Sequence, residues 1–131
     1  MVITNMSLTV VEDPATGTAN CVAGCSVGLN PLEIASLEVP VHPGFRLSCV
    51  ILGIDQGIDR TLFNYPRTVS FNDATDLLRL NQAFQATLSL AMLDEDPGAA
   101  ADELRAEFTI TDLSNGQSVI ERSNLIERFF G

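Results

Sequence analysis

The sequence predicts an all-β fold: a single domain, residues 1–131, built as an antiparallel β-sandwich of about eight or nine strands. Three observations lead to this prediction. Short runs of residues alternate between apolar and polar side chains, breakers such as Gly, Pro, Asn and Asp separate these runs, and helical periodicity is confined to one short segment. A closed β-barrel is the alternative architecture, since it accepts the same number of strands.

The N-terminal segments predict two strands joined by a turn. Residues 6–12 alternate so that Met6, Leu8 and Val10 share a face, and the breaker-rich turn DPATGT follows them. Residues 19–29 combine small side chains with two glycines, a pattern typical of a strand with a bulge or a close backbone approach.

The central segments predict further strands. Residues 36–41 alternate, with Pro40 suited to a sheet edge, and the turn HPG leads into residues 45–54, which are apolar enough to be buried on both faces. Shorter strand candidates follow at residues 60–65 and 68–71.

The last third of the chain contains the best helical candidate and the final strands. Residues 73–82 predict one or two helical turns, capped by Asp73. Residues 85–93, 104–113 and 118–130 predict strands, and an Asn-Gly pair between the last two predicts a hairpin. The predicted core includes Leu8, Val10, Leu37, Val39, Val50, Leu52, Leu88, Leu90, Phe108 and Ile110.

The charge balance is strongly acidic. Seventeen Asp and Glu residues face seven arginines, the chain contains no lysine, and the formal net charge is −10. Such a surface repels phosphate backbones and anionic lipid headgroups, so we expect no nucleic-acid or membrane partner. The chain shows neither a signal-peptide pattern nor a bilayer-spanning apolar run, which predicts a cytoplasmic protein. Its cysteines, Cys21, Cys25 and Cys49, are accordingly expected to be reduced thiols in the core.

Two acidic loops provide candidate metal ligands. Asp55 and Asp59 lie in one loop, and Asp94, Asp96 and Asp102 lie in another; each loop contains a D-x-G-x(1-3)-D motif. Because Ca²⁺ takes about six to eight oxygen ligands, carboxylates that converge from both loops at one end of a sandwich predict a weak calcium site. The alternative is a pair of solvated loops whose charges keep strand edges from pairing.

The pair of acidic motifs resembles the calcium-binding loops of C2 domains, in which a β-sandwich holds calcium between acidic loops at one end. The resemblance is limited to these two loops, and it implies Ca²⁺ as the one candidate cofactor. The basic and aromatic residues with which such loops dock on membranes are absent, so membrane binding does not follow from it.

Enzymatic chemistry has little support in the sequence. His42, the single histidine, lies in the turn VHPGF, and no G-x-S-x-G or comparable context surrounds a nucleophile, so we expect no catalytic residues. Paired carboxylates make a small hydrolase acting on a saccharide the alternative function. Sugar-binding clefts usually present aromatic platforms, however, whereas this chain has no tryptophan and only one tyrosine, Tyr65.

The hypothesis that remains is a non-catalytic binding or assembly module that acts through protein–protein contact, with a homo-oligomer as one form. Phe129 and Phe130 are candidate interface residues, because exposed aromatic side chains form the apolar patches that mark protein interfaces. The alternative is that one of these rings closes the core and the other lies on the surface.

Overall fold

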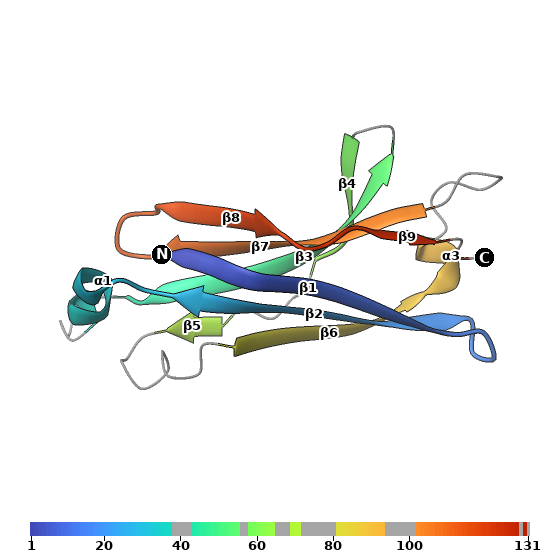
Figure 1. The fold of residues 1–131 in the computed structure, drawn as a ribbon, viewed down its shortest axis with the longest axis horizontal. Coiled ribbons are helices and arrows are strands. Elements are labelled where there is room, and N and C mark those ends of the chain that lie inside the picture. Colours follow the sequence, from blue (N-terminus) through green and yellow to red (C-terminus); the bar gives the residue numbers. More distant parts are fainter. Residues whose placement is uncertain are drawn as a thin grey trace.

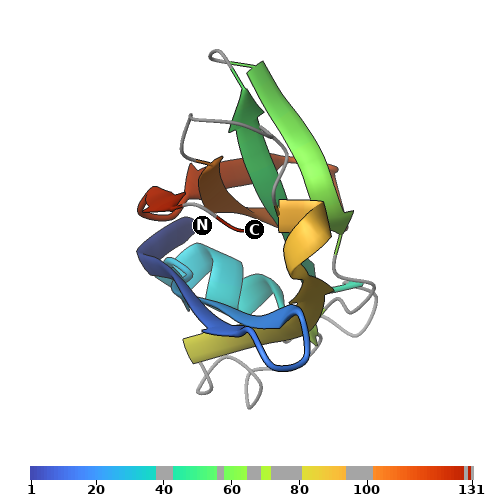
Figure 2. The same ribbon diagram turned by 90° about the vertical axis from the view of Figure 1, so that its right-hand side faces the viewer.

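The architecture is a two-layer β-sandwich. The computed structural model of the chain describes residues 1–37, 43–55, 58–64, 69–71, 81–93, 102–128 and 130. Within these ranges, nine strands form two antiparallel sheets that lie face to face (Figures 1 and 2). The predicted all-β sandwich is therefore confirmed, and the described strands do not close into a barrel.

The first layer is a three-stranded sheet with the order β1-β2-β6. It consists of β1 (Val2–Asp13), β2 (Thr18–Gly28) and β6 (Asn81–Ser89). β1 and β2 form the expected N-terminal hairpin, and β6 pairs with the other side of β2. β2 is thus the central strand of this layer.

The second layer is a six-stranded sheet built on β3 (Phe45–Asp55) and β7 (Asp102–Asp112), which pair with each other. Each of these long strands pairs with two shorter ones. β4 (Ile58–Asn64) and β5 (Val69–Phe71) pair with different parts of β3. In the same way, β8 (Ser118–Arg122) and β9 (Ile126–Arg128) pair with different parts of β7. The hairpin of β3 and β4 extends beyond the two layers (Figure 1).

The predicted Asn-Gly turn joins β7 to β8. Gly116 has a φ of +76°, a left-handed conformation that glycine adopts without a steric penalty. Asp112 begins the turn: its carbonyl accepts the Gly116 N–H at 2.8 Å, and its Oδ1 accepts the Ser114 N–H at 2.9 Å. The carbonyl and the side chain of Asp112 thereby satisfy two turn amides that would otherwise need water.

A bulge in β1 changes which residues face the core. The register with β2 shifts by one residue at Asn5 and Met6, and Asn5 has a φ of 54°. Ile3 is buried before the bulge, whereas Leu8 and Val10 are buried after it, so the inward positions change from odd to even numbers. The predicted face of Leu8 and Val10 is confirmed, and the bulge adds Ile3 to the same core.

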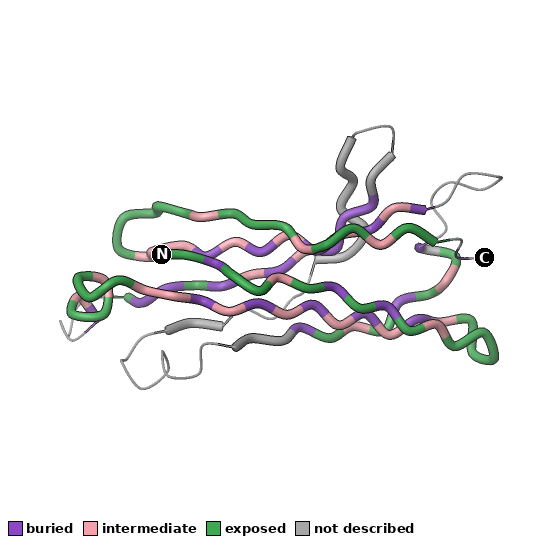
Figure 3. Tube along the Cα trace, in the orientation of Figure 1, coloured by how far each residue is buried: buried purple, intermediate pink, exposed green. Residues whose placement is uncertain are grey.

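The core lies between the two sheets, where small and large residues oppose each other. Along β2 and β7 buried positions alternate with more exposed ones (Figure 3). The inward residues of β2 are mostly small, whereas those of β3 and β7 include phenylalanine, leucine and isoleucine. Phe84 of β6 and Phe108 of β7 meet across the layers, with ring centroids 6.3 Å apart. Small side chains on β2 leave the room that these rings occupy.

Most of the predicted core is confirmed, with two corrections. Val50 is half-buried, because β3 turns Leu47, Cys49 and Ile51 inward and therefore points the intervening position outward. Leu90 is only partly buried, at the start of the short helix that ends β6. Val39 lies outside the described residues.

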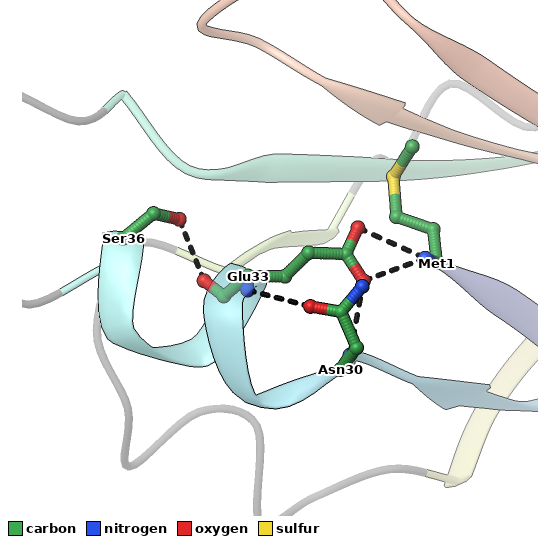
Figure 4. Close-up of polar contacts among 4 residues, drawn as sticks. All are labelled: Met1, Asn30, Glu33 and Ser36. Carbon is green, nitrogen blue, oxygen red and sulfur yellow. Dashed lines mark hydrogen bonds and ion pairs between the residues drawn. The ribbon is translucent and has the colours of Figure 1, made fainter.

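Helix α1 (Pro31–Ser36) was not predicted, although its start signal is present in the sequence. Asn30 Oδ1 accepts the Glu33 N–H at 2.8 Å, and Glu33 Oε1 accepts the Asn30 N–H at 2.9 Å, which is a reciprocal capping box. The amino group of Met1 donates to both carboxylate oxygens of Glu33, at 2.6 and 2.9 Å (Figure 4). Glu33 therefore connects the start of β1 to the helix.

The other sequence expectations concern the remaining helices and loops. Of the predicted helix at residues 73–82, residues 73–80 lie outside the described ranges and Gln82 belongs to β6. The strand expected to reach residue 93 ends at Ser89, followed by helix α3 (Leu90–Leu93). Neither α1 nor α3, the helices that the structure describes, is long and apolar enough to cross a membrane.

Two side chains of the second layer hydrogen-bond to the backbone edge of β1. Asn124, between β8 and β9, accepts the Leu8 N–H at Oδ1 (2.9 Å) and donates from Nδ2 to the Leu8 carbonyl (3.3 Å). Arg128 of β9 donates from Nη1 to the Val10 carbonyl at 2.7 Å. The Asn124 amide thus takes the place of the peptide group of a neighbouring strand, and it joins the two sheets along one side of the sandwich.

Ser123 holds this part of the chain against β7. Its N–H donates to the Ala106 carbonyl, and its Oγ accepts the Ala106 N–H, both at 2.9 Å. These two hydrogen bonds therefore keep the chain attached to β7 between β8 and β9, where the regular strand pairing is interrupted. This attachment positions the adjacent Asn124 toward β1.

We expect Asn124→Ala to lower the free energy of unfolding by about 1–3 kcal/mol, because both backbone groups of Leu8 lose their partner. Urea denaturation followed by circular dichroism measures this loss. Asn20→Ala is the matched control: Asn20 accepts a bond from Gln85 at 3.1 Å on the surface, and its removal should cost less than about 0.5 kcal/mol. Equal losses in the two variants would contradict the role assigned to Asn124.

Candidate functional site

The backbone brings part of the predicted calcium site to one end of the six-stranded sheet. Asp55 is the last residue of β3 and Asp59 lies in β4, while Asp102 is the first residue of β7. In the register of the sheet, Ile54 pairs with Asp59 on one side and with Glu103 on the other. Asp55, Asp59 and Asp102 therefore lie at the same end of this sheet.

The side chain of Asp102 has a structural role. It is 1 % exposed, and its Oδ2 accepts the backbone N–H of Phe130 at 3.2 Å. Asp102 is directed inward because it is in phase with Leu104 and Ala106, the next inward positions of β7. Asp94 and Asp96 lie outside the described residues. Among the described side chains, no group of three or more His, Cys, Asp or Glu is placed to hold a metal ion.

Phe129 and Phe130 were predicted to lie at an exposed interface, and for Phe130 this prediction is wrong. Its ring is fully buried in the core, and its backbone is bonded to Asp102. A buried ring offers no surface to a partner, so Phe130 matches the alternative in which one ring closes the core. Phe129, His42 and Tyr65 lie outside the described residues.

The three cysteines are buried thiols, as expected. Cys21 and Cys25 lie on the inward side of β2, and Cys49 lies on the inward side of β3. Burial raises the pKa of Cys21, raises that of Cys25 to about 11, and raises that of Cys49, which also faces Cys25, to about 12. Because the thiolate is the nucleophile, these cysteines are unreactive at neutral pH and serve as small core residues.

The outward side of the three-stranded sheet is the most distinctive surface in the described structure. We call it the uncharged face. Its residues are exposed or half-buried, and they are Val2, Thr4, Ser7, Thr9, Val11, Thr18, Asn20, Val22, Gly24, Ser26, Gly28, Gln85, Thr87 and Ser89. None of them carries a charge, although 18 % of the chain is charged. Asp13 lies at the margin, where its Oδ1 accepts the Ala15 N–H within the turn.

Strand pairing arranges the uncharged face in rows. One row contains Val11, Asn20 and Thr87, and the next contains Thr9, Val22 and Gln85. At one end Gly28 leaves room for Val2, since a Cβ on Gly28 would lie 2.9 Å from Val2 Cγ2. The result is an array of hydroxyl, amide and valine side chains.

The outward side of the six-stranded sheet has the opposite character. Arg46, Glu103, Arg105, Glu107 and Arg122 lie on it, all at least partly exposed. Arg122 Nε donates to Glu107 Oε2 at 3.0 Å in an exposed ion pair. The sandwich therefore has one charged outer surface and one uncharged outer surface.

The sequence interpretation missed the uncharged face, but a signal for it exists. No charged residue occurs between positions 14 and 32, nor between positions 80 and 93. These intervals contain all of β2 and all of β6, two neighbouring strands of one sheet. A search for strand segments without charge, combined with the alternation that tells which residues of each strand face outward, would have identified this surface.

The predicted calcium site, Asp55, Asp59, Asp94, Asp96 and Asp102, stays a prediction. Calcium that binds the folded state at a hundred times its dissociation constant would stabilise it by about 2.7 kcal/mol. We therefore expect a higher melting temperature in millimolar calcium than in EDTA, with magnesium as the control for ionic strength. Coincident melting curves would identify the acidic loops as solvated.

We expect Phe130→Ala to destabilise the fold by about 3–5 kcal/mol, because it empties a fully buried position. Chemical denaturation at low protein concentration, where association is negligible, measures the effect. Val11→Ala is a control at a residue that is 61 % exposed, and it should change stability by less than about 0.5 kcal/mol. A small effect of Phe130→Ala would mean that its ring does not support the core.

Comparisons with known proteins find no relative of this chain: no family model matches it, and neither a curated protein nor a solved structure does.

Proposed function

We propose that this chain is a non-catalytic binding or assembly module that acts through protein–protein contact, and that the uncharged face is its contact surface. The observation that carries the proposal is that, apart from Asp13 at the margin, the described residues of that face carry no charge in a chain of net charge −10. We also place the module in the cytoplasm, which the three buried thiols support.

The cost of removing water favours the uncharged face over the charged one. Burying an isolated charge is expensive, whereas a hydroxyl or amide that finds a new hydrogen-bond partner on the other protein is buried at little cost. Charged residues are accordingly depleted in the centres of protein interfaces. The opposite surface, with Glu107 and Arg122 among its charged groups, would have to be desolvated at a much higher cost.

Two apolar residues near the ends of the face add to the attraction. Val2 is 55 % exposed and Val11 is 61 % exposed, both on β1. Covering them removes apolar area from water, which contributes roughly 25 cal/mol per Å². The face thus combines a modest hydrophobic contribution with many neutral hydrogen-bonding groups.

Photo-crosslinking tests the proposed surface. We expect p-benzoylphenylalanine at Val22, in the middle of the uncharged face, to form protein adducts in an extract of the cells that make the chain. The same group at Thr109, half-buried on the opposite outer surface, should form none. Thr9→Lys, next to Val22 in the register, should suppress the adducts. Equal adducts at both positions, or none at Val22, would contradict the proposal.

A further inference from the structure

We infer that the partner of the uncharged face is the same face of a second copy of this chain. The inference rests on the proposed function, because it names the protein that the contact surface binds. Three properties of the face lead to it: its lack of charge, its hydrogen-bonding groups and its size.

Two copies of this acidic chain can associate only through a surface that avoids repulsion between their carboxylates, and the uncharged face is such a surface. Each copy carries a formal charge of −10, so most ways of bringing them together place carboxylates near carboxylates. The uncharged face avoids this, because no described side chain on it carries a charge apart from Asp13 at the margin. A cationic partner would gain nothing from this face, since the carboxylates that would attract it lie elsewhere.

The hydrogen-bonding groups are self-complementary. A symmetric dimer brings the same patch of both subunits together, so each group must be able to bond to its own kind. Hydroxyls and amides, such as those of Thr9, Asn20 and Gln85, both donate and accept hydrogen bonds, whereas carboxylates only accept them. Two copies of the uncharged face can therefore satisfy each other.

The size of the face suits a reversible dimer. β2 has 11 residues, and with a rise of about 3.3 Å per residue and strands about 4.8 Å apart, the sheet covers roughly 500 Å² in projection. Side chains make the accessible area larger than this projection, which brings it near the low end of specific interfaces, about 600 Å² per partner. We therefore expect a dimer that forms and dissociates with concentration.

Sedimentation velocity of the purified chain tests the inference. Between about 1 μM and about 1 mM we expect the mass to rise from one chain to two. The association should strengthen with salt, because the Debye length falls from ~30 Å at 0.01 M to ~8 Å at 0.15 M and the repulsion between the copies is screened. A monomer throughout, or association that weakens with salt, would overturn the inference.

A pair of lysine variants locates the contact. Val22→Lys places a charge at the centre of the uncharged face, and we expect it to weaken the dimer by about tenfold or more. Thr109→Lys is the matched control, a β-branched and half-buried residue on the opposite outer surface, and the dimer should be unchanged. Far-UV circular dichroism and denaturation confirm that both variants fold. Equal weakening by the two variants would overturn the assignment to this face.

The crosslinking experiment separates the inference from the proposed function. If Val22 forms adducts in the cell extract while the purified chain stays monomeric, the partner is another protein and only the inference fails. If the purified chain stays monomeric and no adduct forms at Val22, the proposed contact surface fails as well.

Discussion

Among the described residues, no strand pairs with the outer edge of β1, and two side chains from the other sheet satisfy three backbone groups of that edge. Asn124 bonds to both backbone groups of Leu8, and Arg128 bonds to the carbonyl of Val10. A backbone group left without a partner costs free energy comparable to a lost hydrogen bond, so these contacts are a requirement of the layered arrangement. Because both side chains come from the six-stranded sheet, the bonds that satisfy β1 also fix the position of one sheet relative to the other.

This arrangement gives β2 two different tasks. Its inward side is mostly alanine and cysteine, because the rings of Phe84 on the neighbouring β6 and Phe108 on the facing β7 need the space. Its outward side consists of hydroxyl, amide, valine and glycine residues, so the surface has short side chains and no charge. A strand with small residues on both sides contributes little hydrophobic area of its own. Its stability therefore depends on the large residues of the opposite layer and on pairing with β1 and β6.

The sequence predicted best where alternation is strict. The alternation in β7 predicts its inward residues in the correct phase, and the same phase explains why the side chain of Asp102 is buried. The position of β3 was predicted correctly. Both of its sides are apolar, however, so the sequence does not indicate which residues face the core, and Val50 was assigned to the wrong side. Phe130 could not be placed locally, because its anchor at Asp102 is 28 residues away. The uncharged face depends on the pairing of β2 with β6, another contact between distant segments. The start of α1, by contrast, is a local signal, because Asn30 and Glu33 form a capping box within three residues.

The bulge at Asn5 and Met6 places two residues of β1 opposite one residue of β2, Cys25. Because side chains alternate with a period of two, losing one residue at the bulge would restore regular pairing without turning either segment over. Ile3 would still face the core and Val2 would still face water, while Leu8 and Val10 would keep their places. An insertion or deletion between Leu8 and Val10 would instead turn one of these two side chains away from the core. The bulge is thus the position in β1 where the chain can change by one residue and still keep its attachment to the second layer.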